Sequence, residues 1–182
     1  MMKKESDFLY IFRLAAVLLI ITSLVAAALA GVNSITAPAI ARLTAEKTQM
    51  AIEAVLPGGG EEIEFAPADL VSKVYKGENG YAIEVTPGGF DNTITMMVGV
   101  DFEGKVLGID IIKHTETAGL GAVADAETPA GQNFRGQFVG TSGSVAVTKD
   151  GGAMDSITGA TITSRAICDG VNAALACAAT LG

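Results

Sequence analysis

Residues 92–114 read NTITMMVGVDFEGKVLGIDIIKH, and this stretch decides the fold. Two runs rich in β-branched residues flank DFEGK (101–105), which is typical of a tight turn. Side chains alternate along a strand, so the apolar residues of the first run share one side: Ile94, Met96, Val98 and Val100. The stretch therefore predicts a hairpin in an antiparallel sheet with one covered face.

Helical patterns lie on both sides of this strand region. Residues 33–60 begin with polar residues and Pro38, then follow helical spacing until Pro57 and three glycines stop the helix. The last segment of the chain places apolar residues on one helical face: Ile167, Val171, Leu175, Ala178 and Leu181. Strands in the middle and helices at both ends predict an α+β domain.

Two segments between the hairpin and the final helix are less regular. Residues 115–140 are rich in Gly and Thr and show no sustained period. Irregular stretches of this length are often functional. Residues 142–152, SGSVAVTKDGG, predict a further strand that ends in a turn.

An apolar segment near the N-terminus, Leu14–Val32, has nineteen residues and no charge. As a helix it would span about 28 Å, close to the roughly 30 Å of a bilayer's hydrocarbon core. Three cationic residues precede it: Lys3, Lys4 and Arg13. The positive-inside rule then predicts a single-pass helix with a cytoplasmic N-terminus, and everything after Gly31 outside the cytoplasm.

A cleaved signal peptide is the competing interpretation, because ALA at 28–30 fits a cleavage site. The apolar run exceeds the usual h-region of about 7–15 residues, so we expect a retained anchor. The chain then divides into a cytoplasmic N-terminus with its transmembrane anchor (1–32), a juxtamembrane helix and linker (33–60), and a domain (61–182).

Charge and cysteine content exclude several classes of function. The net charge is −8, and beyond Ala30 nine basic residues face eighteen acidic ones, so the domain would repel nucleic acid. Cys168 and Cys177 fall on one predicted helix about 13.5 Å apart, which is too far for a disulfide. We therefore expect both cysteines to behave as small buried hydrophobic residues. His114 is the single histidine, so a multi-histidine metal site is excluded and no metal is expected.

The stretch SITGATITS (156–164) holds five hydroxyl groups just before the final helix. Thr163 or Ser164 is expected to be its N-cap. Gly159 and Ala160 leave Thr161 in an uncrowded loop, where a large reagent can reach its hydroxyl. Backbone N–H groups at a helix start also favour a phosphate, so the local chemistry suits a phosphate that is either bound or attached.

DSITGAT, Asp155 to Thr161, resembles the recognition motif of proteins that carry covalently attached FMN. In that family a flavin transferase moves FMN from FAD onto the final threonine as a phosphoester. The resemblance implies Thr161 as the acceptor, not Thr158 or Thr163. It also implies that the rest of the motif contributes to the cofactor site: Asp155, Thr158, Gly159 and Ala160.

A second segment, HTETAGLG (114–121), resembles the one that such FMN-binding domains place against the flavin, usually H-x-E-T-P-G-L-G. Ala118 stands where proline is common. The resemblance implies Glu116 and Thr117 as polar contacts and Leu120 as an apolar contact. Alone, the segment is typical of an ordinary Gly-rich turn, but two motifs about forty residues apart in the expected order favour the flavin interpretation.

Together the anchor and both motifs resemble the G subunit of the Rnf electron-transport complex, related to the C subunit of the sodium-pumping NADH:quinone oxidoreductase, which is typically longer. The resemblance implies an FMN electron relay in the cell membrane, part of an ion-translocating ferredoxin:NAD oxidoreductase and not catalytic alone. Its partners would be other membrane subunits of the complex, the flavin transferase, and lipid around the anchor. The chemistry would be the flavin's, with no catalytic side chain beyond it.

Three alternatives stay open at this level. The chain is also compatible with an FMN-carrying subunit of the sodium-pumping oxidoreductase or with a stand-alone extracytoplasmic electron-transfer flavoprotein. An anchored, non-redox binding or assembly module is the alternative without flavin. Lys149 and Arg165 lie near the motif in sequence, and each is either a phosphate contact or a solvated surface charge.

Overall fold

The computed structural model describes residues 3–181, and its contacts divide the chain into two units, Met1–Leu43 and Thr44–Gly182. Helix α1 (Lys3–Val55) continues through Pro38 rather than starting after it, and it ends just before Pro57, as predicted. In the first unit the large apolar side chains of α1 are exposed, Leu24 by 72%. The side chains of Lys3 and Lys4, on which the expected orientation rests, lie outside the described part.

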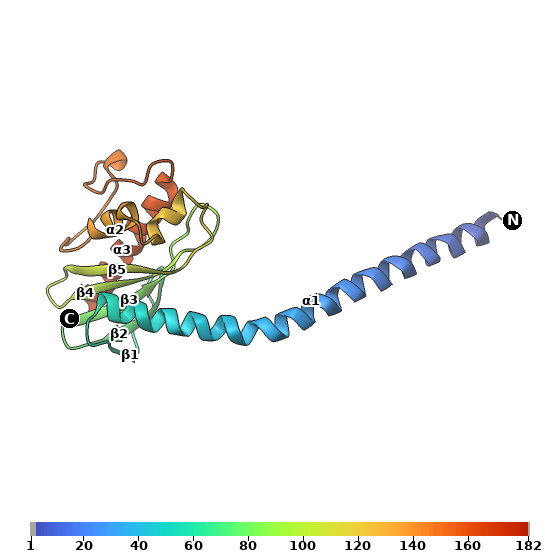
Figure 1. Ribbon diagram of the computed structural model, residues 1–182, viewed down its shortest axis with the longest axis horizontal. Coiled ribbons are helices and arrows are strands. Elements are labelled where there is room, and N and C mark those ends of the chain that lie inside the picture. Colours follow the sequence, from blue (N-terminus) through green and yellow to red (C-terminus); the bar gives the residue numbers. More distant parts are fainter. Residues whose placement is uncertain (1–2, 182) are drawn as a thin grey trace. The chain divides into compact units, whose positions relative to one another are not determined.

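The second unit is built on a five-stranded antiparallel sheet whose strands follow one another in chain order (Figure 1). The strands are β1 (Glu61–Ile63), β2 (Val71–Lys76), β3 (Gly80–Val85), β4 (Thr95–Asp101) and β5 (Val106–Lys113). The predicted hairpin is β4–β5, and its turn closes with the Asp101 N–H donating to the Lys105 carbonyl at 2.9 Å. Gly104 has a φ of 79°, which explains why the turn needs a glycine.

One face of the sheet packs against α3 (Thr161–Leu181), the predicted final helix. The strand residues expected to share a covered side all belong to this core and are at most 1% exposed: Ile94, Met96, Val98 and Val100. Ile167 and Val171 of α3 are fully buried against them. The predicted α+β class and the α3 stripe are confirmed.

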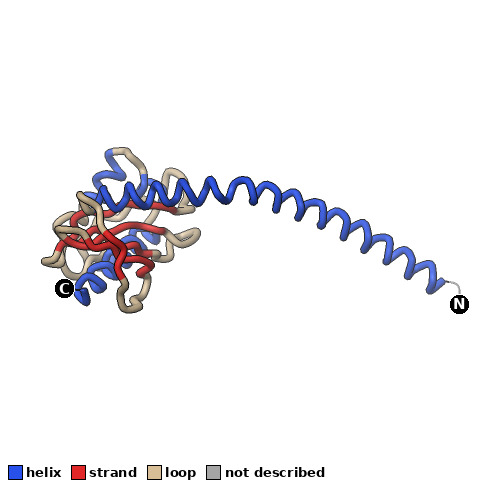
Figure 2. The backbone as a smooth tube through the Cα atoms, turned by 90° about the horizontal axis from the view of Figure 1, so that it is seen from below, coloured by secondary structure: helices blue, strands red, loops and turns tan. Residues whose placement is uncertain are grey.

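The expectation of a single covered face is wrong, because the last turn of α1 covers part of the other face (Figure 2). A second buried cluster joins residues at the end of α1 to residues of the sheet: Ala51, Ile52, Val55, Leu56, Tyr75, Ala82, Met97 and Ile112. Gly99 pairs with Gly108 across β4 and β5, and a Cβ at Gly99 would overlap the Val55 carbonyl oxygen. Gly99 therefore lets the helix backbone approach the sheet, whereas a Cβ at Gly108 would lie in ordinary contact with Val55, 3.8 Å from its Cα.

Short helices occupy the irregular segments. Residues 115–140 contain the 3₁₀-helix η1 (Gly121–Asp125) and α2 (Pro129–Gly136), which is too short to show a period. Thr128 caps α2 by accepting from the Gly131 N–H, and proline follows at the first helical position.

The strand expected at 142–152 is wrong. This segment holds the 3₁₀-helix η2 (Thr148–Asp150) and single bridges from Ser142 and Val147. The Val145 N–H and carbonyl are instead paired with the side-chain amide of Asn172 on α3, at 2.8 and 2.9 Å. A side chain satisfies the backbone groups that a strand neighbour would have taken.

Both cysteines lie on the buried side of α3 and are free, as predicted. Burial raises the pKa of the Cys168 thiol to about 11, so the thiol stays protonated near neutral pH. Cys168 and Cys177 thus serve as small core residues.

Candidate functional site

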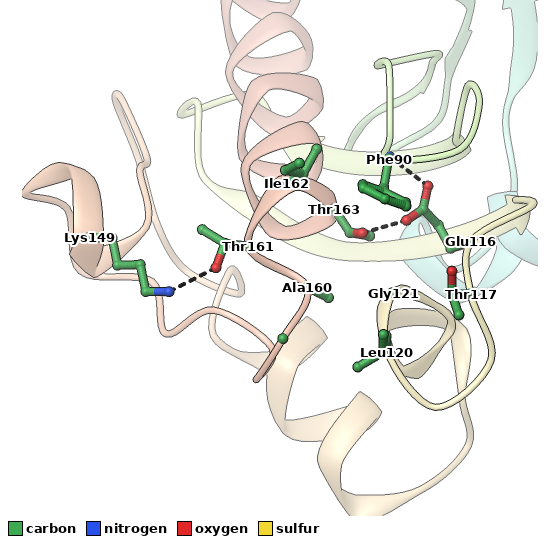
Figure 3. A pocket seen from close by; sticks show the side chains of 11 residues that line it. Phe90, Glu116, Thr117, Leu120, Gly121, Lys149, Ala160, Thr161, Ile162 and Thr163 are labelled. Carbon is green, nitrogen blue, oxygen red and sulfur yellow. Dashed lines mark hydrogen bonds between the residues drawn. The ribbon is translucent and has the colours of Figure 1, made fainter.

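A cavity of about 260 Å³ opens where three segments meet: the loop between β3 and β4, the segment after β5, and the start of α3 (Figure 3). Lys149 of η2 closes one side, opposite Phe90 and Glu116. The lining residues are Phe90, Glu116, Thr117, Leu120, Gly121, Lys149, Gly159, Ala160, Thr161, Ile162 and Thr163. The cavity therefore brings the two sequence motifs together.

Glu116 joins the three segments. Its side chain is buried, and one carboxylate oxygen accepts from the Phe90 N–H at 2.8 Å while the other accepts from the Thr163 hydroxyl. Glycines make room for it: a Cβ at Gly121 would lie 2.5 Å from Oε2, and one at Gly89 would overlap Oε1. Because both oxygens are engaged by protein donors, Glu116 shapes the cavity.

The expected cap role of Thr163 and Ser164 is wrong, since α3 begins at Thr161 and both residues lie in its first turn. The buried Ser164 hydroxyl accepts from the Ile157 N–H and donates to the Ala160 carbonyl, each at 3.0 Å. The buried Thr163 hydroxyl donates to Glu116. These hydroxyls tie the preceding loop and the Glu116 segment to the helix.

Thr161 is the first residue of α3 and lines the cavity. Its hydroxyl oxygen accepts from the Lys149 ammonium at 2.9 Å (Figure 3). Gly159, with a φ of 77°, turns the chain into the helix, and a Cβ there would lie 2.9 Å from the Leu120 side chain. A polar hydroxyl and a cation thus meet beside the free N–H groups of a helix start.

The other predicted site residues fall into two groups. Thr117 and Leu120 are exposed on the cavity lining, next to Gly159 and the buried Ala160. Asp155 and Thr158 do not line this cavity but a neighbouring hollow. There the Gln137 side chain accepts from the Asp155 N–H at 2.7 Å and donates to its carbonyl at 3.3 Å. Contacts of all these residues with a flavin remain predictions.

Sequence reasoning missed two apolar lining residues, Phe90 and Ile162, which are 65% and 49% exposed. Phe90 lies outside both motifs, and the glycine pair before it is the one signal of a special loop. Of the two cations left open, Lys149 lines the cavity and Arg165 does not. Arg165 forms two 2.6 Å hydrogen bonds with Asp150 and lowers the pKa of that carboxyl.

Residues 89–176, which contain both motifs, match the family model of the FMN-binding domain, so this part of the chain is of the FMN-binding class. The chain is 31% identical to the G subunit of the Na(+)-translocating ferredoxin:NAD(+) oxidoreductase complex of Acetobacterium woodii, over 93% of this chain and 92% of the relative.

It is also 31% identical to the G subunit of the ion-translocating oxidoreductase complex of Methanosarcina acetivorans, over 93% of this chain and 95% of that protein. The corresponding protein of Yersinia pestis is 48% identical, over 52% of this chain and 47% of its own. The chain belongs to the family of G subunits of ion-translocating oxidoreductase complexes, which confirms the resemblance to the Rnf protein.

The Glu116–Thr163 contact gives a testable prediction. Glu116→Gln and Thr163→Val are each expected to lower the free energy of unfolding, with a coupling of about 1–3 kcal/mol in a double-mutant cycle. Glu116→Gln removes the charge of the acceptor and replaces one of its oxygens with an NH2 group, and Thr163→Val removes the donor of the buried hydrogen bond. Urea unfolding of the full chain in mild detergent measures it.

The matched control is the exposed pair Glu103 and Lys105, also in hydrogen-bond contact, for which no measurable coupling is expected. Additive effects of Glu116→Gln and Thr163→Val would show that the contact does not join the segments.

Proposed function

We propose that this chain carries FMN, attached through a phosphoester to Thr161, and relays electrons as a membrane-anchored subunit of an ion-translocating oxidoreductase complex. The observation that supports this most strongly is the position of the Thr161 hydroxyl, on the lining of a cavity to which both motifs contribute. The family of the chain and the redox complexes of its relatives support the same proposal.

The residues present fit FMN. The hydroxyl of Thr161, the ammonium of Lys149 and the start of α3 suit a phosphate group. Phe90, Leu120 and Ile162 offer exposed apolar surface for a flat aromatic ring. The cavity is also open at Gly159, where any side chain would meet Leu120.

FMN, once bound, supplies reversible electron transfer, and the side chains of this chain position it. Glu116 fixes the Phe90 loop against the start of α3, so the cavity walls keep their spacing. Attachment through the phosphate leaves the ring unmodified, so the surrounding residues set its potential. The apolar side chains of Phe90, Leu120 and Ile162 would exclude water from a ring that lies against them.

Maturation by a flavin transferase requires an accessible acceptor. Thr161 is partly exposed, and Asp155, Thr158 and Gly159 of the motif before it are exposed. Gln137 holds the Asp155 backbone in place. The recognition motif is thus presented on a fixed loop at the surface, where another enzyme can bind it.

We also propose that α1 anchors the chain in the cell membrane, surrounded by lipid and by other subunits of the complex. Among the described residues it is the one helix long and apolar enough to cross a bilayer, with a mean hydropathy of 2.5 in its most apolar window. Thr22 returns its hydroxyl to the Leu18 carbonyl at 2.9 Å. Leu14–Val32 contains no acid or base, so ion translocation is assigned to other subunits.

The acceptor assignment is tested by co-expressing the chain with a flavin transferase and recording fluorescence in a denaturing gel. A fluorescent band is expected, because a phosphoester survives denaturation. Thr161→Ala should abolish the band, and Thr161→Ser should retain part of it. Thr180→Ala, a matched change at the far end of α3, should leave the band unchanged.

Persistent fluorescence in Thr161→Ala would contradict the acceptor assignment. A wild-type chain whose intact mass equals that of the bare polypeptide after co-expression would favour the anchored, non-redox binding module instead.

The orientation is tested by fusing alkaline phosphatase after Gly182. The fusion should be active, because this enzyme forms its disulfides only outside the reducing cytoplasm. The control is the same fusion to a chain without residues 1–32, which should stay inactive inside the cell. An inactive full-length fusion of normal abundance would place the domain in the cytoplasm.

A further inference from the structure

Lys149 is the one cationic side chain that lines the cavity in the described part of the chain. Its ammonium donates to the Thr161 hydroxyl oxygen at 2.9 Å. The other charged lining residue, Glu116, already has its two oxygens engaged by Phe90 and Thr163. The charge of Lys149 is thus in hydrogen-bond contact with Thr161 Oγ1, the proposed attachment atom.

The fold holds Lys149 in this position. Asp150, the next residue of η2, forms two hydrogen bonds of 2.6 Å with Arg165, which lies one helical turn after Thr161 on α3. This bidentate salt bridge fixes η2 to the helix that carries Thr161. It also occupies Arg165, whose guanidinium points its donors at Asp150 rather than into the cavity. Two neighbouring cations therefore have separate tasks.

We propose that Lys149 is a positioning residue for flavin attachment and the counter-ion of the attached phosphate. This inference rests on the proposed function, in which Thr161 receives FMN. In this geometry Lys149 fixes the direction of the threonine hydroxyl, and its charge lies beside the oxygen that would bond to phosphorus.

The transfer step explains why a cation belongs there. The Thr161 O–H bond breaks and an Oγ1–P bond forms, while the P–O bond of the FAD pyrophosphate breaks and AMP leaves with that oxygen and its electron pair. The proton passes to a base of the flavin transferase or to water, and nothing is oxidised or reduced. Negative charge develops on Oγ1 as the proton leaves, and the Lys149 ammonium stabilises that charge.

The product also needs a cation. A phosphate that links FMN to a threonine is a diester with one negative charge. Beyond Ala30 the chain has nine basic and eighteen acidic residues, so a further anion is added to an already acidic domain. Lysine has three donors on a flexible stem and can follow the phosphoryl oxygens after Oγ1 becomes the ester oxygen.

The test measures the initial rate of flavin incorporation by intact mass, using the full chain in detergent, the flavin transferase and FAD. Lys149→Gln is expected to lower kcat by about tenfold, because it removes a hydrogen bond from a charged group to the reacting atom. KM for the chain should stay nearly unchanged, since the recognition motif at 155–161 is intact. Lys149→Arg should restore much of the rate.

Lys105→Gln is the matched control, with the same loss of charge in the β4–β5 turn, at the opposite end of β5 from the 114–121 segment. Its rate should equal that of the wild type. Asp150→Asn weakens the bidentate salt bridge with Arg165 and leaves the Lys149 side chain unchanged. It should therefore lower the rate of flavin incorporation less than Lys149→Gln does.

If the chain takes up flavin and Lys149→Gln reacts as fast as Lys105→Gln, the role of Lys149 is overturned, while the proposed function stands. A loss of rate in Lys149→Gln that Lys149→Arg does not restore, or a loss expressed only in KM, would also overturn it. Labelling that persists in Thr161→Ala would instead contradict the proposed function, in which Thr161 receives FMN. Failure of the Lys149 proposal and failure of the proposed function are therefore distinguishable.

Discussion

The buried carboxylate of Glu116 is the constraint on which the site depends. A buried charge is tolerated only with hydrogen-bond donors around it, and here the donors come from two other segments, the Phe90 N–H and the Thr163 hydroxyl. Satisfying the carboxylate therefore fixes the β3–β4 loop, the segment after β5 and the start of α3 relative to one another. The glycines at 89 and 121 are needed because a side chain at either position would occupy the space of the carboxylate.

The rest of the second unit supports that arrangement. The sheet presents the ends of β3 and β5 beside the start of α3, and α3 is held by the buried side chains of β2, β3 and β4. Asn172 on α3 pairs with the Val145 backbone, and Arg165 pairs with Asp150, so the segment carrying Lys149 is fastened to the same helix. Thr161, at the helix start, thereby acquires its surroundings from four separate parts of the chain.

The elements with a regular period were predictable from the sequence, and those made by contacts distant in sequence were not. Alternation in 92–114 predicted the hairpin, and the apolar stripe predicted α3. The cover of the second sheet face was missed because it depends on Gly99 admitting the backbone at the end of α1. The prediction of a strand at 142–152 was wrong because the side-chain amide of Asn172, 27 residues further along the chain, pairs with the N–H and carbonyl of Val145. Phe90 reaches the cavity from outside both motifs, so neither motif indicated it, and position in the sequence alone left Lys149 and Arg165 undecided as phosphate contacts.

The central claim is that the Thr161 hydroxyl, rather than its neighbours, is the point of flavin attachment. Thr158 is exposed but lies on a different hollow, and the hydroxyls of Thr163 and Ser164 are buried and engaged. Trypsin cleaves after Lys149 and Arg165, so one peptide, 150–165, carries all these hydroxyls. Tandem mass spectrometry of this peptide from the flavin-loaded chain should place the flavin phosphate on Thr161 alone. A flavin phosphate on Thr158 or Thr163 would contradict the account.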